Sequence, residues 1–463
     1  MILSIDPGSV AGLPAKEQAL LARLLVVYQE NSSSNEQKKK YYEGNISLND
    51  VNLGLALPDG MRRLEIGCAW GTKCVDVLAS RSMFDGFVDA NGQSVDALDR
   101  IVAGNNLLVG YGKGCRDELT YGCTFITLSR DDRVGAKIRF HSPRGAAAIW
   151  DGDKGRIAAG FAVIDAAPDN SKNQIWTPRV INLYTDTDVW VLVMDGNGWT
   201  AYRFPQPMGR PLMEAMAFGS TSDKPFGRSR IKEPVRRLID GYVRTIANAS
   251  IGLEFATSPQ KYILGVTDEQ YGALVNDKFR QYVGAILAAT ANPETGEKPT
   301  FGQLTQGSLQ PHADMLRMLS AQFAAATGLT VNDVGVVTDS NPTSADAILA
   351  QSTTLISTAE QLNAVNAEAL RSVALMALAI ANGTSLSGLS EDETAVMAHF
   401  KNPAMPSVAV TADAAVKIAG ARQGFAETDV FLEMLGFSQA DIRRIRAQEQ
   451  RARGAAILQE LDI

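Results

Sequence analysis

The segment "GRSRIKEPVRRLIDGYVRTIANAS", residues 227–250, decides how the second half of this chain is organised. At 100° per residue its apolar side chains fall on one stripe, which predicts a half-buried helix. The predicted stripe consists of Ile231, Val235, Leu238, Ile239, Tyr242, Ile246, Ala249 and Leu253, with Val243 at its margin. Arg230, Arg237 and Arg244 recur at every seventh position on the opposite side. These arginines either bind nucleic acid or form a solvated face, and base rates favour the solvated face.

The charge balance argues against a protein that grips DNA tightly. The 463-residue chain has a formal net charge of −7, and residues 223–256 hold seven basic and four acidic side chains. Tight binding to DNA needs a strongly basic surface that neutralises many phosphates. The sequence shows no run of eighteen apolar residues and no signal-peptide pattern, so we expect a soluble protein that is made in a cytoplasm. With 45% hydrophobic residues, the chain has enough apolar material for about two to four domains.

The residue types that carry enzyme chemistry are not grouped in this sequence. Four cysteines lack zinc-ligand spacing and are expected to be buried thiols, and three histidines have no second ligand at i+3 or i+4. These residues are Cys68, Cys74, Cys115, Cys123, His141, His312 and His399. No GxSxG nucleophile motif occurs. We therefore predict no catalytic residues, no metal and no cofactor.

Two other patterns favour turns over sites. The glycines of "VGYGKGCRD", at 110, 112 and 114, fit neither the Walker nor the Rossmann spacing, and they predict the end of a helix. The Asp-rich stretches "SRDDR" and "YTDTD" lie at strand ends, where Asp commonly forms turns.

The first half of the chain has the pattern of an α+β domain. We predict a helix over residues 11–30, a polar loop through "ENSSSNEQKKKYYEGN", and largely helical structure from about 61 to 110. Short β-branched and aromatic runs cut by Gly, Asp and Asn then predict an antiparallel sheet from about 123 to 205.

The second half is dominated by long helices. After a helix over 228–256, "PQKYILG" predicts a strand, "TDEQYGALVNDKFRQYV" a short helix, and the following Pro/Gly-containing segment two strands. Residues 309–328 predict a helix of about five turns, 329–342 a loop, and 343–382 a helix on the order of 60 Å long. Two or three shorter helices are predicted near the C-terminus.

This order of elements resembles the portal proteins of tailed bacteriophages over roughly residues 40–450. The segments that carry the resemblance are "YYEGN", the opening helix continued through "YILG", "FGQLTQGSLQPHADMLRMLSAQFAAATGL" and "NPTSADAI". The resemblance implies an α+β, portal-like fold that assembles into a ring. Its implied parts are 1–225 N-terminal region and wing, 226–256 first stem helix, 257–308 clip, 309–328 second stem helix, 329–342 tunnel loop, 343–382 long wing helix, and 383–463 crown and C-terminal tail.

The resemblance also implies a function. It implies a ring of about twelve copies at one capsid vertex of the virion, assembled in the cytoplasm of a bacterial host, through which double-stranded DNA passes. The implied partners are terminase, the major capsid protein and a head-completion or adaptor protein, with no membrane. A head-tail connector outside the packaging vertex and a nuclease are the alternatives; the long paired helices argue against the first, and the missing metal site argues against the second.

Three groups of residues are the candidate sites that follow from this resemblance. The tunnel-loop residues are Val331, Asn332, Val334, Val336, Val337, Thr338 and Asp339. The stem charge rings are Arg230, Arg237 and Arg244, which face either DNA or a neighbouring subunit. The clip surface that meets a partner is Glu294, Thr295, Glu297 and Lys298.

Overall fold

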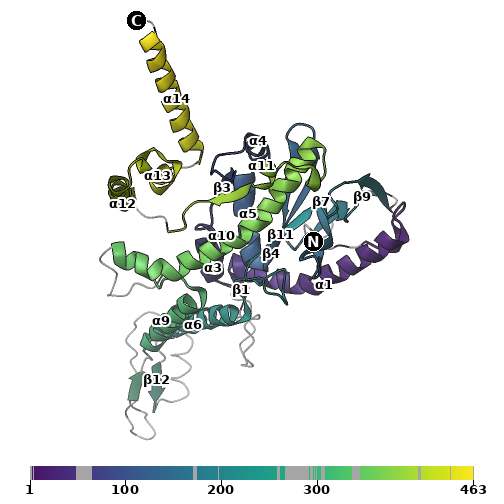
Figure 1. Ribbon diagram of the computed structural model, residues 1–463. Coiled ribbons are helices and arrows are strands. Elements are labelled where there is room, and N and C mark those ends of the chain that lie inside the picture. The colour runs from purple at the N-terminus through teal and green to yellow at the C-terminus, as the bar shows by residue number, and fades with distance from the viewer. Residues whose placement is uncertain are drawn as a thin grey trace. The chain divides into compact units, whose positions relative to one another are not determined.

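The computed structural model describes most of the chain. The described residues are 3, 5–47, 65–169, 175–196, 198–257, 261–265, 291, 296, 298, 300–303, 308–335, 345–404, 408–437 and 439–461. By their contacts they form two compact units, whose elements are labelled in Figure 1. Unit 1 is Met1–Gly44, Ala69–Arg236 and Ala324–Ile463, and unit 2 is Asn45–Cys68 and Arg237–Phe323.

Helix α1, Ala15–Glu43, is longer than the sequence predicts. The polar run that was expected to form a loop instead continues the helix as far as Gly44, whose φ of 77° ends it. The loop prediction is wrong because Ser and Asn weaken a helix only slightly. Burial of Asn35 and Tyr41, at 3% and 4% exposure, adds packing that composition does not reveal. A short 3-10 turn, η1 (Pro7–Ser9), precedes this helix.

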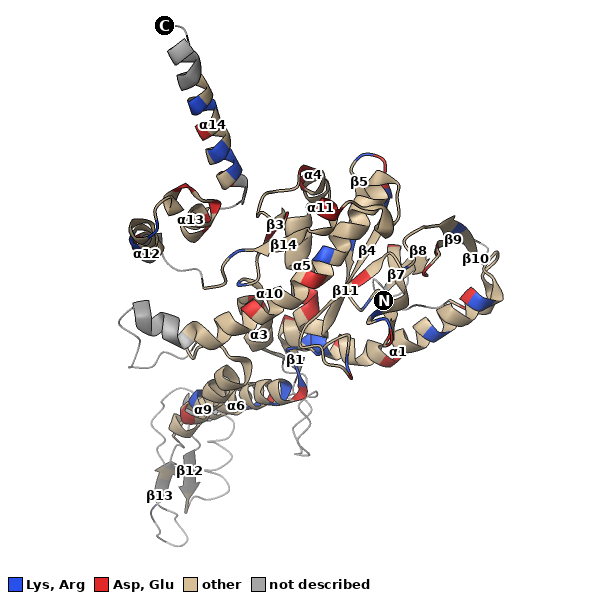
Figure 2. Cartoon of the chain, in the orientation of Figure 1, with Lys and Arg blue, Asp and Glu red and all other residues tan. Residues whose placement is uncertain are grey.

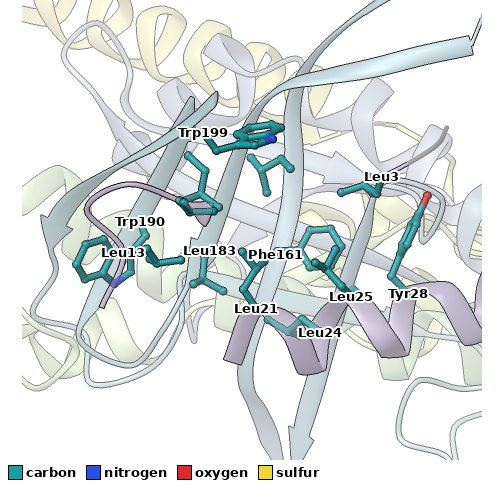
Figure 3. Close-up of a cluster of buried hydrophobic side chains, with 14 residues drawn as sticks. Leu3, Leu13, Leu21, Leu24, Leu25, Tyr28, Phe161, Leu183, Trp190 and Trp199 are labelled. Carbon is teal, nitrogen blue, oxygen red and sulfur yellow. The ribbon is translucent and has the colours of Figure 1, made fainter. Parts of the chain in front are cut away.

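The larger sheet of unit 1 has five strands in the order β10-β9-β8-β7-β6, all antiparallel. Its strands are β6 (Ala146–Asp151), β7 (Arg156–Asp169), β8 (Ile175–Tyr184), β9 (Asp188–Asp195) and β10 (Gly198–Pro205). Helix α1 packs on this sheet, with Leu21, Leu24 and Leu25 directed toward Phe161 and Leu183 (Figure 3). The predicted antiparallel strands are confirmed, but the single sheet predicted over about 123–205 is divided between this sheet and a second one.

A second sheet of three antiparallel strands has the order β11-β4-β5. Its strands are β4 (Cys123–Asp131), β5 (Gly135–His141) and β11 (Met213–Ala217), and helices α5 (Leu107–Tyr121) and α10 (Ala345–Asn382) pack against it. Gly110 and Gly114 lie inside α5, so the predicted helix-ending turn is wrong. A Cβ on Gly114 would lie 2.4 Å from the ring of Phe140, so the missing side chain lets helix and sheet approach closely.

The region between α1 and α5 mixes helix and strand. Helices α3 (Trp70–Ala79) and α4 (Asp96–Gly104) confirm part of the helical prediction. Residues 84–88 form strand β3 instead, paired antiparallel with β14 (Met397–Phe400). Phe84 contacts the ring of Phe400 at 5.7 Å. A strand whose partner lies some three hundred residues away has no local sequence signal, which is why the helical prediction failed here.

Shorter elements follow α10 in unit 1. They are η2 (Leu386–Gly388), α11 (Glu391–Thr394), α12 (Val408–Ala421), η3 (Phe425–Glu427), α13 (Asp429–Met434) and α14 (Gln439–Leu461). Helices α12, α13 and α14 confirm the shorter helices predicted near the C-terminus. Figure 2 shows basic residues along α14. One basic residue of this helix, Arg446, pairs with Asp429 at 2.7 Å and with Glu449 at 2.8 Å.

Unit 2 contains two small antiparallel sheets and parts of two helices. The sheets pair β1 (Asn45–Ser47) with β2 (Glu65–Gly67), and β12 (Lys261–Leu264) with β13 (Thr300–Gln303). The helices are α6 (Glu233–Thr257) and α9 (Gln310–Thr327). The strand predicted at "PQKYILG" is confirmed. The short helix predicted over 267–283 lies outside the described residues.

Candidate functional site

Helix α6 begins at Glu233, seven residues later than the implied boundary at 226. Before it, Gly227 has a φ of 68°, and a Cβ there would lie 2.4 Å from the carbonyl oxygen of Phe218. The chain therefore passes very close to a neighbouring segment in a conformation that only glycine adopts easily. Pro234 suits the first helical turn, where its missing N–H costs nothing, and Glu233 complements the positive end of the helix dipole.

Arg230 lies outside this helix and is buried, with only 8% of its surface exposed. Its guanidinium donates to the carbonyl oxygens of Cys74 in α3 and Thr327 at the end of α9. Its backbone N–H donates to the carbonyl oxygen of Leu119 in α5 at 2.8 Å. The prediction that Arg230 belongs to a helical row of surface charges is wrong. Arg230 instead joins three helices inside unit 1.

Arg237 and Arg244 do lie on α6, where Arg237 is exposed and Arg244 is half-buried. The buried ridge of the helix is formed by Val235, Ile239, Val243 and Ala247, none more than 2% exposed. Val243, predicted at the margin of the stripe, is fully buried, whereas Leu253 is 51% exposed. The ridge follows steps of four residues, the row that packs into the grooves of neighbouring helices, and so departs from the stripe drawn at 100° per residue.

Helices α6 and α9 run side by side within unit 2, as Figure 1 shows. A Cβ on Gly241 would lie 3.2 Å from Leu319, and a Cβ on Gly252 would lie 3.2 Å from Leu309. As the chain proceeds along α6 from Gly241 to Gly252, its partner residues run backwards from Leu319 to Leu309. The two helices are therefore antiparallel. Glycine inside a helix costs about 1 kcal/mol relative to alanine, and the packing of the two leucine side chains against the backbone of α6 offsets that cost.

A compact turn follows α9. Gly328, with a φ of 67°, ends the helix, and the N–H of Leu329 donates to the carbonyl oxygen of Ala324 at 3.1 Å, as in a Schellman motif. The side chains of Thr330 and Asp333 then bond to each other at 2.8 Å. Each of these two side chains also accepts from the other residue's backbone N–H. The start of the predicted tunnel loop is therefore an ordered turn.

The tunnel-loop candidates differ in accessibility. Val331 is half-buried, Asn332 is exposed, and Val334 is buried with 9% of its surface exposed. The remaining candidates, Val336, Val337, Thr338 and Asp339, lie outside the described residues. Of the clip candidates, Lys298 is exposed. Glu294, Thr295 and Glu297 lie outside the described residues.

Helix α10 is fixed to the core of unit 1 by a buried polar network that the sequence reasoning missed. The amide of Asn366 donates to a carboxyl oxygen of Glu118 at 2.8 Å and to the hydroxyl of Tyr111 at 3.2 Å. Ser82 bonds to that hydroxyl at 2.5 Å and donates to the amide oxygen of Asn363 at 2.6 Å. In the sequence, the two polar residues Asn363 and Asn366 within a long apolar helix could have indicated this network.

Glu118 is fully buried, and burial raises the pKa of its carboxyl to about 8, although the hydrogen bond from Asn366 lowers it. The carboxyl is therefore largely protonated at neutral pH. Burial also raises the pKa of Tyr111 well above its ordinary value. The network is thus a set of uncharged polar groups at neutral pH, which fix the register of α10 on α5 without burying a net charge.

The apolar character of α10 follows from the same packing. Ser352–Asn382 is long and apolar enough to cross a membrane, but 56% of its most apolar window is buried inside the protein. Core helices of globular proteins share this composition. We therefore assign the hydropathy of α10 to its contacts with the three-stranded sheet.

Groups that could carry chemistry are scattered. Within the described ranges, no cluster of three or more His, Cys, Asp or Glu side chains is arranged to hold a metal ion. All four cysteines are buried and free, as predicted. His141 bonds to Thr127 at 2.8 Å, and burial lowers its pKa to about 4, so its ring is neutral. His399, for which the sequence showed no neighbouring ligand, lies 3.9 Å from a carboxylate oxygen of Asp85 and 3.8 Å from one of Glu433.

The described residues thus include a helical hairpin, an ordered turn and a long helix anchored on an antiparallel core. The family model "Phage portal protein, SPP1 Gp6-like" matches residues 22–455. The chain belongs to this family of phage portal proteins, whose role is structural.

Curated relatives agree with this assignment. The portal proteins of Mycobacterium phages D29 and L5 are each 26% identical to the chain, over 423 and 422 residues. Each alignment covers 88% of this chain and 84% of the relative.

Solved structures resemble the chain more loosely. A chain from the neck of a native gene transfer agent particle has a TM-score of 0.46 at 14% identity, covering 80% of this chain and 89% of its own. A chain from the virion of the native gene transfer agent particle has a TM-score of 0.44 at 13% identity, with the same coverage.

Proposed function

We propose that this portal protein forms a closed ring of about twelve copies at one vertex of a tailed-phage capsid. Double-stranded DNA passes through its channel during genome packaging and again during ejection. The observation that carries this proposal is the order of the antiparallel α6–α9 hairpin, the turn after Gly328 and helix α10, in a chain of the portal family. We further propose that the ring is assembled in the host cytoplasm and remains in the virion, in contact with the major capsid protein.

Each part of the hairpin region has a proposed role. Helices α6 and α9 form the stem, in which a ring repeats Arg237 and Arg244 once per subunit. Val331, Asn332 and the segment 336–339 face DNA at the narrowest point. The net charge of −7 suits this role, because each phosphate that the protein neutralises would hold the DNA more tightly.

The clip, residues 257–308, is the proposed docking surface for terminase and later for a head-completion or adaptor protein. Lys298, which is exposed, belongs to this surface together with Glu294, Thr295 and Glu297. Removing the three charges of this surface, at Glu294, Glu297 and Lys298, should weaken terminase binding in a pull-down with purified proteins and leave ring formation unchanged. Unchanged terminase binding would place the docking surface elsewhere.

The assembly can be tested directly. Native mass spectrometry and electron microscopy of the purified full-length chain should show closed rings of about twelve copies with an axial opening. Only monomers or dimers in moderate salt would contradict the proposal.

The tunnel-loop role needs a functional assay. Replacing residues 331–337 with glycine and serine should leave rings intact but reduce DNA packaging or retention, because the loop loses the bulk that contacts DNA. A matched replacement in the turn between β6 and β7, residues 152–155, should leave packaging unchanged. Normal packaging with the altered 331–337 segment would show that these residues are an ordinary connection between helices.

A further inference from the structure

Unit 1 contains a cavity of about 540 Å³ that none of the proposed roles uses. Its walls come from α1, from β4 and β6, and from the connection that leads to α6. Its floor is apolar and includes Phe125, Ala147 and Phe226. Five basic side chains border it, namely Lys38, Lys224, Arg228, Lys232 and Arg236, and no Asp or Glu is among its lining residues.

In the described part of the chain, the five cations have no acidic partner. Among the ion pairs of the described residues, none involves any of these five side chains. The ammonium of Lys38 donates instead to Asn35 at 3.3 Å and to the carbonyl oxygen of Tyr121 at 2.9 Å. Arg236 donates to the carbonyl oxygen of Ile231 at 3.0 Å.

This arrangement is unusual for the chain. The protein as a whole is acidic, with a net charge of −7, and the nearby Arg144 is paired with Glu36 at 2.9 Å. Burial, with a further contribution from the charge of Arg236, lowers the pKa of Lys38. Like charges that converge on a cavity destabilise the folded protein unless an anion enters.

The shape of the cavity selects among anions. Double-stranded DNA carries its phosphates on a convex surface, which cannot enter a recess of this size. A nucleotide base would stack on an aromatic ring, but Phe226 already contacts Phe125 at 5.6 Å and Trp150 at 5.8 Å, both edge to face. Tyr28 likewise contacts Phe161 at 5.9 Å, which leaves Tyr121 as the other aromatic side chain of the lining. An apolar floor with a cationic border matches a peptide in which carboxylates lie next to an apolar side chain.

We propose that this cavity binds an acidic peptide segment of a partner protein. Carboxylates of the segment pair with Arg228 and Lys232, which are exposed at the border, and an adjacent apolar side chain rests on Ala147 and Phe226. Lys38 and Asn35 supply donors deeper in the cavity. This site does not depend on the ring, the channel or the clip.

The test uses the purified full-length chain and a fluorescein-labelled peptide of alternating glutamate and leucine. Fluorescence anisotropy should show saturable binding that weakens as salt rises. A peptide with glutamine in place of glutamate should bind at least about tenfold more weakly, as should the double variant Arg228→Glu, Lys232→Glu, because each loses charge-assisted hydrogen bonds. Arg23→Glu, which reverses an exposed charge on α1 away from the cavity, should bind like the wild type.

Circular dichroism must first show that the double variant is folded, which its exposed positions favour. No saturable binding by the wild type, or equal binding of the glutamate and glutamine peptides, overturns the proposal. So does binding of inorganic phosphate or a short DNA duplex in place of the peptide, because the cavity would then be a phosphate site. A changed subunit number in the double variant, without peptide binding, would identify a second copy of this chain as the occupant and would also overturn it.

Discussion

Arg230 and Arg237 are one heptad apart in the same basic segment, yet they occupy opposite environments. Arg230 is 8% exposed and donates to carbonyl oxygens of two helices, whereas Arg237 is exposed on α6. The difference arises because α6 starts between them, at Glu233. Periodicity predicts which residues would share a face if a helix existed, but not where the helix begins.

Helices α10 and α6 differ in the interactions that hold them in place. Helix α10 is fixed by directional hydrogen bonds among Asn366, Glu118 and Tyr111. Helix α6 packs on α9 through glycines and aliphatic side chains, such as Gly241 against Leu319. Directional bonds specify one register, while an aliphatic ridge accepts small shifts at lower cost. We therefore expect substitutions within the buried polar contacts of unit 1 to be costly and substitutions of the more exposed polar side chains of α6 to be nearly neutral.

The largest effect is expected for Arg230→Met. The variant keeps most of the side-chain volume but leaves the carbonyl oxygens of Cys74 and Thr327 without their charged donor, which should cost about 3 kcal/mol of unfolding free energy. All five tryptophans lie in unit 1, so urea unfolding followed by tryptophan fluorescence reports on this unit.

The matched control is Arg237→Met, which removes a similar but exposed side chain. Because Arg237 lies in unit 2, both variants are also followed by far-UV circular dichroism, to which the helices of both units contribute. The free energy of unfolding of Arg237→Met should differ from that of the wild type by no more than about 0.5 kcal/mol. Equal effects of the two substitutions would mean that the buried contacts of Arg230 contribute little.

A somewhat smaller loss is expected for Asn366→Leu. The substitution fills the volume, but it removes the amide that donates to Glu118 and Tyr111. A carboxyl oxygen of Glu118 is then left unpaired and the Tyr111 hydroxyl keeps only its bond to Ser82, at a cost of about 2 kcal/mol. The control Val365→Leu changes a neighbouring side chain that is 44% exposed and should be close to neutral. A neutral Asn366→Leu variant would show that aliphatic packing alone holds α10.

The sequence predicted what depends on local pattern. The paired helices around residues 233–257 and 310–327, the long helix and the antiparallel strands all follow from periodicity and turn residues. It failed where distant contacts decide the outcome. The polar second half of α1 stays helical because Asn35 and Tyr41 are buried, and β3 exists because β14 pairs with it.

The candidate site was predicted less completely than the fold. Seven-residue spacing grouped the buried Arg230 with Arg237 and Arg244 of α6 because the sequence pattern carries no information about burial. The resemblance selected the loop after α9, but it did not reveal the exchange of hydrogen bonds between Thr330 and Asp333. The basic cavity could not be predicted from the sequence because Lys38 is far along the chain from Lys224 and Arg228.

The pH dependence of the stability of unit 1 tests the buried network without removing a hydrogen-bonding side chain. Glu118 has a pKa of about 8 in the folded protein and an ordinary value of 4.5 when unfolded, so the folded state retains a proton that the unfolded state loses. The stability from this group is complete below pH 4.5 and disappears as the pH rises through about 8. Glu118→Gln should remove that decline.

The measurement compares urea midpoints of wild type and Glu118→Gln between pH 7 and 9. This window avoids the buried carboxyl of Asp117, whose pKa is raised only to about 6. The variant should gain stability relative to the wild type as the pH increases. Parallel pH profiles would show that Glu118 is already ionised in the folded protein.

The smallest effect is expected on α6, for Arg244→Gln. Arg244 is half-buried, and glutamine preserves helix propensity and a polar tip, so the thermal midpoint followed by circular dichroism should correspond to a change within about 0.5 kcal/mol. If Arg244 braces a neighbouring subunit in the proposed ring, the salt concentration that dissociates the ring should fall while the fold is unaffected. A loss of folding stability comparable to that of Arg230→Met would instead place Arg244 among the buried, directional contacts and remove the distinction between the two regions.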